Sequence, residues 1–180
     1  KPKDFFLLRF EEQTLKASYV VLATGTVERR EKADDSNKYV IGLVGVASFD
    51  AKNKRVAVLG GGDSACEAYE LVKDTAEDVR IFARTVRANN TMWSAIPDDV
   101  KQVGKYSLSD NAVILCGQEY EFDSAVVCYG WQPSVPAMDF EVTQSPTGHI
   151  IVDQNMQTSV KNFFAIGDVN QRPYPCVSTA

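Results

Sequence analysis

The chain has 180 residues, 44% of them hydrophobic, and carries 19 basic against 24 acidic side chains for a formal net charge of -5. This length and apolar content suit one ordinary domain or two small ones. The acidic balance and the lack of a basic stripe argue against nucleic acid as a partner. Because no apolar run approaches the ~20 residues that cross a bilayer, we expect no membrane span and a cytoplasmic protein.

The N-terminal part predicts a β-hairpin followed by a linker. Residues 5–10 and 14–22 are rich in aromatic and β-branched side chains and flank the polar Glu11-Glu12-Gln13. The second strand leads into Ala23-Thr24-Gly25. Residues 27–38 are highly charged and show neither the helical nor the strand period, so we expect a solvated loop there.

The central part predicts a βαβ unit. Residues 54–59 form an apolar strand, a glycine-rich turn follows, and residues 64–74 and 79–83 predict a helix and a second strand. Such a crossover implies a parallel sheet. Residues 88–104 predict only a loop or a broken helix that packs an aromatic side chain.

Five further short segments in the C-terminal part predict strands: 112–115, 120–122, 125–129, 149–152 and 163–166. The first two flank a turn at Gly117 and predict a hairpin. The third looks buried and ends just before Gly130.

The turn after the central strand matches the dinucleotide fingerprint G-x-G-x-x-A. Gly60 permits the tight turn, Gly62 lets the backbone approach a pyrophosphate, and Ala65 lets the helix pack closely on the strand. The helix N-terminus then offers unpaired amides and a positive dipole end to an anion. The plainer alternative is a glycine-rich connection without a ligand.

The end of the second strand indicates which nucleotide would bind. A residue that binds the ribose 2′-hydroxyl of NAD(H) would be an Asp or Glu at this position. The sequence instead has Ala83, followed by Arg84 and Arg87. Two guanidinium groups suit a 2′-phosphate, which favours NADP(H) over NAD(H), with two solvated arginines as the alternative.

Two shorter motifs flank this region. One is Thr24-Gly25, and the other is Gly167-Asp168, which directly follows a predicted strand. A short carboxylate such as that of Asp168, beside a glycine that permits close approach, can accept hydrogen bonds from a sugar-alcohol chain. The alternative for Asp168 is a helix cap or a turn residue.

The cysteines and the histidine predict no redox or metal site. The four cysteines are far apart, so we expect free thiols packed as small apolar side chains, and no metal ligands. They are Cys66, Cys116, Cys128 and Cys176, and for Cys176 a further role stays open because it lies beside the Gly167-Asp168 motif. We expect the single histidine, His149, to begin a strand after a turn rather than to act in catalysis.

Together these residues resemble the thioredoxin-reductase-like branch of the FAD-dependent pyridine nucleotide-disulfide oxidoreductases. The resemblance implies an α/β, Rossmann-like FAD/NAD(P)-binding fold: a three-layer ββα sandwich with a parallel sheet and a β-meander crossover. For NADP(H) it implies Gly60, Gly61, Gly62, Asp63, Ser64, Ala65, Arg84, Arg87 and Gly130 as binding residues. On the FAD side it implies Thr24, Gly25, Gly167 and Asp168.

The same resemblance implies a domain order. Residues 1–45 would be part of an FAD-binding domain with a linker, residues 46–134 an inserted NADP(H)-binding domain, and residues 135–180 the rest of the FAD part. Family members open with their own FAD glycine motif, which this sequence does not show. We therefore expect a portion of a longer protein that is inactive by itself.

Departures from the family concern the electron acceptor. Where thioredoxin reductases carry a redox C-x-x-C, spacing places Leu43-Val44-Gly45-Val46 here, so no thiolate can attack from that site. This resembles the ferredoxin/flavodoxin-NADP reductases of the same fold, which lack the dithiol. Where the branch often has Arg-Gln beside the flavin, Tyr174-Pro175 stands.

The resulting expectation is an NADPH-dependent flavoprotein oxidoreductase with no side chain acting as acid or base. Hydride would pass from NADPH to FAD and on to a carrier protein such as ferredoxin or flavodoxin. One alternative is a thioredoxin reductase homologue that acts on disulfides through a thioredoxin-like partner. Another is a nucleotide-binding or regulatory module without turnover, motivated by Pro175 and the reduced basic cluster. Relatives of this kind are commonly homodimers.

Overall fold

The computed structural model describes residues 5–30 and 38–171 and shows an α/β fold of two compact units. Unit 1 combines the segments Lys1–Val27 and Trp131–Ala180, and unit 2 is Glu28–Gly130. No helix in the described residues is long and apolar enough to cross a membrane.

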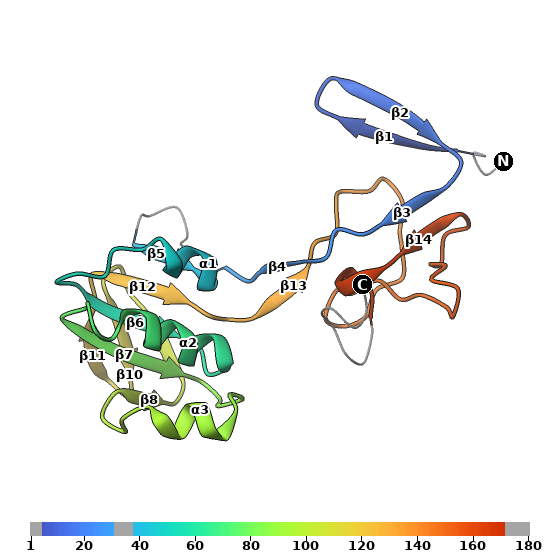
Figure 1. The fold of residues 1–180 in the computed structure, drawn as a ribbon. Coiled ribbons are helices and arrows are strands. Elements are labelled where there is room, and N and C mark those ends of the chain that lie inside the picture. The colour runs from blue at the N-terminus through green and yellow to red at the C-terminus, as the bar shows by residue number, and fades with distance from the viewer. Residues whose placement is uncertain (1–4, 31–37, 172–180) are drawn as a thin grey trace. The chain divides into compact units, whose positions relative to one another are not determined.

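Unit 2 is built on five parallel strands in the order β5-β12-β6-β7-β8 (Figure 1). Their bounds are β5 (Tyr39–Ile41), β12 (Ser124–Val127), β6 (Arg55–Leu59), β7 (Asp78–Ala83) and β8 (Lys101–Val103). Strands β6 and β12 are almost wholly buried, as expected of a parallel sheet covered on both faces.

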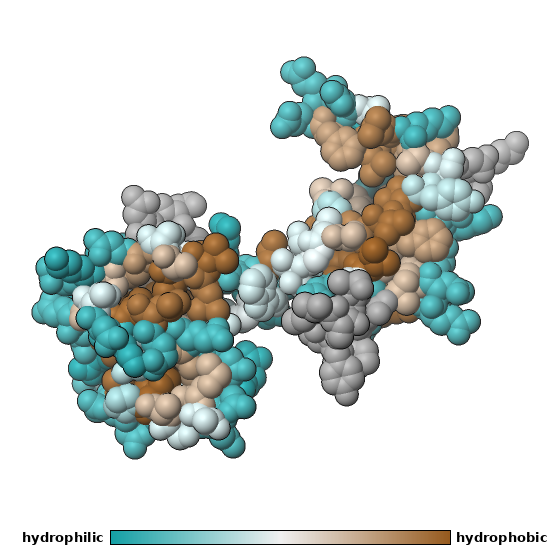
Figure 2. All heavy atoms as spheres, in the orientation of Figure 1, coloured by the Kyte–Doolittle hydropathy of each residue, from teal (hydrophilic) through white to brown (hydrophobic). Residues whose placement is uncertain are grey.

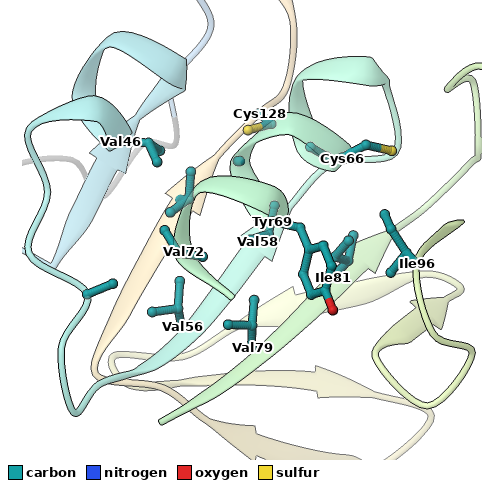
Figure 3. Close-up of a cluster of buried hydrophobic side chains, with 14 of the residues drawn as sticks. Val46, Val56, Val58, Cys66, Tyr69, Val72, Val79, Ile81, Ile96 and Cys128 are labelled. Atoms are coloured by element: carbon teal, nitrogen blue, oxygen red, sulfur yellow. The ribbon is translucent and has the colours of Figure 1, made fainter. Parts of the chain in front are cut away.

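Alternating side chains of the sheet face two different layers. On one face, Val56 and Val58 join the cluster in Figure 3, which packs against α1 (Gly42–Ala47), α2 (Asp63–Val72) and α3 (Asn90–Ala95). On the other face, Ala57 and Leu59 meet an antiparallel meander. The meander consists of β9 (Tyr106–Leu108), β10 (Ala112–Leu115) and β11 (Gln118–Glu121). These three layers are the expected sandwich.

Unit 1 contains short strand pairs around a small core. Its strands are β1 (Phe6–Phe10), β2 (Gln13–Ala17), β3 (Val20–Leu22), β4 (Thr26–Glu28, whose last residue belongs to unit 2), β13 (Trp131–Pro133) and β14 (Phe163–Ala165). The pairs are β1-β2, the parallel β3-β14, and β4-β13. Hydrophobic residues are visible on the surface of this unit (Figure 2). Val21 of β3, for example, is 57% exposed.

Several elements differ from the sequence expectation. Residues 14–22 form two strands, because β2 pairs with β1 whereas β3 pairs with β14. The expected strand at 149–152 is wrong: only Ile150 makes isolated bridges, with Gln144 and Asn170. The expected loop at 27–38 begins with the end of β4, and residues 31–37 lie outside the described part.

The region 88–104 is more regular than expected. The Asn89 side chain caps α3 by accepting a hydrogen bond from the Thr91 amide at 2.9 Å, and β8 follows. The predicted packing of an aromatic side chain is confirmed, because Trp93 packs against the core cluster on the helical face of the sheet.

An ion pair between Arg55 and Asp123 lies at the amino end of the sheet, and it predicts how stability depends on pH. The Arg55 guanidinium donates to both Asp123 carboxylate oxygens, at 3.2 and 2.9 Å, and holds the pKa of Asp123 at about 2, below its ordinary 3.8. A lowered folded-state pKa stabilises the fold above the unfolded-state value, and this contribution is lost as pH falls through about 2.

We expect Asp123→Asn to lower the free energy of unfolding at neutral pH, with a difference from wild type that shrinks as pH falls from about 4 to about 2. Urea unfolding followed by circular dichroism across that range measures it. Asp98→Asn, which removes a pair between Lys101 and a fully exposed carboxylate, is the control with little expected effect. A constant Asp123→Asn difference down to pH about 2 would contradict the assignment.

Candidate functional site

The turn between β6 and α2 accommodates only glycine at two positions. Gly60 has φ +148°, and a Cβ there would lie 2.3 Å from the Cys128 carbonyl oxygen. At Gly61 a Cβ would lie 2.2 Å from the Thr85 carbonyl oxygen. The residues that follow β12 and β7 therefore contact the loop closely on two sides.

Gly62 differs from these two glycines, because no described residue beyond its chain neighbours comes within 4 Å of the position that its Cβ would take. It is also the N-cap of α2, with no side-chain cap. The amides of Ala65 and Cys66 turn back to the Gly62 carbonyl, at 2.9 and 3.4 Å. The open side of the loop thus faces the first turn of a ten-residue helix, where amides without partners inside the helix attract anions.

The other residues of this first turn have different environments. Ala65 is fully buried, which permits the close helix packing expected of it. The carbonyl of Ser64 accepts from the Cys128 thiol at 3.5 Å. The Asp63 carboxylate accepts from the Asn89 amide at 2.6 Å, so it ties α2 to the loop after β7.

That loop after β7 carries the two arginines and is bonded to the glycine turn. The amides of Arg87 and Ala88 donate to the Gly61 carbonyl, at 2.6 and 2.9 Å. Both Arg84 and Arg87 are exposed. The Arg84 guanidinium carbon lies 4.9 Å from the centroid of the Tyr106 ring.

The register of the sheet brings these groups to one edge. Leu59 is paired with Phe82 on β7 and with Val127 on β12, so the carboxyl ends of the three strands are level. Gly130, with φ +85°, follows β12, and its carbonyl accepts from the Arg29 amide at 2.8 Å. The glycine turn, both arginines and Gly130 therefore lie at the carboxyl edge of the sheet, where ligands of open α/β sheets bind.

The expected flavin-side residues lie in unit 1, at the ends of β3 and β14. The Ile166 amide donates to the Leu22 carbonyl at 2.9 Å, so the two strand ends are adjacent. Gly25 and Gly167 have φ values of +63° and +70°, which favour glycine. The Thr24 hydroxyl donates to the Ser134 carbonyl, and Asp168 is half-buried in a 3-10 turn.

Thiol chemistry has little support in the described residues. Leu43 to Val46 lie in α1, where no cysteine occurs. Cys66 and Cys128 are buried, and burial raises both pKa values, that of Cys128 to about 12. Cys116 is exposed in the turn after β10, contrary to the expectation that it packs as an apolar side chain. Cys176 and Tyr174-Pro175 lie outside the described residues.

Two residues that support the site were not predicted from the sequence. Tyr106 reaches Arg84 from the meander, and its hydroxyl shares a hydrogen bond with that of Tyr129 at 3.2 Å. The backbone amide of Asn89 donates to the Asp63 carboxylate, and because any residue except proline has such an amide, the sequence does not indicate this contact. Both contacts depend on tertiary structure.

Solved structures confirm the fold. The structure resembles thioredoxin reductase from T. acidophilum with a TM-score of 0.73 at 21% identity, covering 99% of this chain and 66% of that one. It also resembles the water-forming NADH oxidase from Lactobacillus brevis with a TM-score of 0.68 at 23% identity, covering 88% and 40%. These likenesses bear out the Rossmann-like α/β fold.

Sequence relatives lead to the same family. Thioredoxin reductase from Mycoplasma genitalium is 29% identical over 98% of this chain and 64% of its own length. Thioredoxin reductase from Treponema pallidum is 27% identical over 91% and 60%. The chain thus spans less than two thirds of each of these relatives. Residues 90–180 match the pyridine nucleotide-disulphide oxidoreductase family, and because this match covers half of the sequence, the chain belongs to that family.

Proposed function

We propose that this chain supplies the NADPH-binding part of a flavoprotein oxidoreductase. The observation that carries the proposal is one edge of the sheet, where the open glycine turn, the start of α2 and two exposed arginines come together. Bound NADPH would supply a hydride and bound FAD would accept it, so the cofactors do the redox chemistry. The protein binds and orients them.

The pyrophosphate of NADPH fits the open side of Gly62. Apart from its chain neighbours, none of residues 5–30 and 38–171 comes within 4 Å of its Cβ position, and the first amides of α2 follow directly. These amides would donate to phosphate oxygens without any side chain. The Asp63 carboxylate accepts from the Asn89 amide, which gives it a structural task beside the binding role proposed for this residue.

The end of β7 fits a nucleotide with a 2′-phosphate. Ala83 is buried and carries no acid for a ribose hydroxyl, while Glu77 and Asp78 lie at the opposite end of the strand. Arg84 and Arg87 are exposed at the carboxyl end and can present forked donors to a phosphate. This supports NADP(H) over NAD(H).

For FAD we propose the strand ends of unit 1. Thr24 and Gly25 follow β3, and Gly167 and Asp168 follow β14, the parallel neighbour of β3. Asp168 would accept hydrogen bonds from the ribityl chain. We propose that residues 46–134 form the nucleotide domain, with 1–45 and 135–180 contributing to the flavin domain.

The absence of a dithiol at the expected position guides our proposal for the electron acceptor. Because α1 carries Leu43 and Val46 where a redox cysteine pair would stand, a carrier protein such as ferredoxin or flavodoxin is favoured. The thioredoxin reductase relatives favour the second candidate, a thioredoxin-like disulfide partner. A cytoplasmic location and a homodimer belong to the same proposal.

Arg84→Ala tests the choice of nucleotide. We expect the Kd for NADPH to rise about 10- to 100-fold, because a charged hydrogen bond to the 2′-phosphate is lost, while the Kd for NADH stays within about twofold. Fluorescence titration of the full-length protein measures both. Arg80→Ala is the control, since Arg80 binds Asp78 near the other end of β7. Equal losses for both nucleotides would refute the 2′-phosphate assignment.

A further inference from the structure

Tyr106 forms a platform for the arginine that follows β7. The Arg84 guanidinium carbon is 4.9 Å from its ring centroid, within cation–π range. Tyr106 opens β9 and is only 5% exposed. An exposed cation is therefore attracted to the ring of a buried residue.

Two contacts fix the ring of Tyr106. The Phe82 ring meets it edge-on, with centroids 6.1 Å apart and planes at 65°. Its hydroxyl shares a hydrogen bond with the Tyr129 hydroxyl, just beyond the end of β12. The ring is thus anchored in the core between sheet and meander and at the edge where Gly130 lies.

The contact leaves the donors of Arg84 available. Attraction to an aromatic face uses the charge of a guanidinium and does not require its N–H groups. Within residues 5–30 and 38–171, no side chain forms an ion pair with Arg84 or accepts a hydrogen bond from it. A phosphate can therefore accept hydrogen bonds from several of those N–H groups.

A second arginine–tyrosine pair, formed by Arg80 within β7, has a different environment. Arg80 lies 5.3 Å from the Tyr120 ring centroid, but its Nε donates to the Asp78 carboxylate at 3.1 Å. Phe82 contacts both tyrosine rings. The two arginine–tyrosine pairs thus differ in two ways: Arg80 is ion-paired with Asp78, and only Arg84 lies beside the glycine turn.

We infer that Tyr106 is a positioning residue that sets the preference for NADPH by holding Arg84 ready for the 2′-phosphate. This inference rests on the proposed function. A flexible arginine loses side-chain freedom when it binds a phosphate, and a preformed contact with a fixed ring reduces that loss. Tyr106 itself does not touch the nucleotide in this role.

The test compares NADPH and NADH dissociation constants in the full-length protein. Tyr106→Leu is expected to weaken NADPH binding about 3- to 30-fold and to leave NADH unchanged, whereas Tyr106→Phe keeps the wild-type ratio. In an Arg84→Ala background, Tyr106→Leu adds no further loss. Tyr120→Leu is the matched control: it removes the other pair from the same core and leaves the ratio unchanged.

If Tyr106→Leu does not fold, phenylalanines of increasing fluorine content at position 106 replace it, because fluorine weakens the ring's attraction for a cation while largely keeping its shape. NADPH affinity should then fall stepwise at constant NADH affinity. A flat series, or a Tyr106→Leu loss that persists without Arg84, overturns the inference alone. A wild-type protein without preference for NADPH overturns the proposed NADPH specificity and the inference with it.

Discussion

Gly61→Ala is expected to destabilise unit 2 by about 3 kcal/mol and to abolish nucleotide binding. The new Cβ would lie 2.2 Å from the Thr85 carbonyl oxygen and 2.9 Å from the Ala83 Cβ. Neither atom can move without shifting backbone. A shift of Gly61 would also strain the two bonds that its carbonyl accepts from Arg87 and Ala88. Thermal and urea unfolding measure the stability, and calorimetry measures the binding of NADPH.

Gly62→Ala is the matched control, because its Cβ would meet no neighbour within 4 Å in the part of the chain that the structure describes. We expect a stability loss below about 1 kcal/mol, the cost of a poorer N-cap. NADPH should nevertheless bind at least about tenfold more weakly, because the methyl group would occupy the approach of the pyrophosphate. Unchanged NADPH affinity in Gly62→Ala would place the pyrophosphate elsewhere, and a stable Gly61→Ala would show that the loop relaxes.

Blocking thiols is expected to leave turnover from NADPH to a carrier protein intact. Burial raises the pKa of Cys128 to about 12, so this thiol stays protonated at neutral pH. Burial raises the pKa of Cys66 as well. Spacing predicts the dithiol at Leu43 and Val46, which are not cysteines, so we expect no described cysteine pair to take part in electron transfer.

The measurement compares full-length protein before and after iodoacetamide treatment, with ferredoxin or cytochrome reduction in one assay and thioredoxin-coupled disulfide reduction in the other. Cys116 is exposed, so we expect it to be labelled, and Cys116→Ser identifies any effect of that label. Disulfide reduction that disappears on alkylation would contradict the carrier-protein proposal and favour the thioredoxin-like partner.

The sequence predicted the elements whose residue types carry a strong pattern. Strand β6, helix α2 and strand β7 are confirmed within a few residues, because an apolar run, a glycine turn and a second apolar run are local signals. Strands β4, β5, β8, β9 and β13 were missed. Each has three residues and forms because a partner strand lies beside it, which a local pattern does not show.

The candidate site was predictable to a similar degree. The glycine motif predicted a tight turn at Gly60, and the structure has one, with no room for a Cβ. The binding of a nucleotide at this turn stays a prediction. The contact of Tyr106 with Arg84 could not be predicted, because β9 reaches the end of β7 only after the meander folds onto the sheet. The hydrogen bond between Asp63 and Asn89 uses the backbone amide of Asn89, so the residue type at position 89 could not predict it.

The most direct test is an anaerobic titration of the full-length protein with NADPH, followed by the visible absorbance of flavin. We predict a yellow protein whose flavin bleaches in proportion to added NADPH, and far less efficiently with NADH. A colourless protein that binds NADPH, or a yellow one that binds it without bleaching, would contradict the oxidoreductase proposal and favour a nucleotide-binding module without turnover.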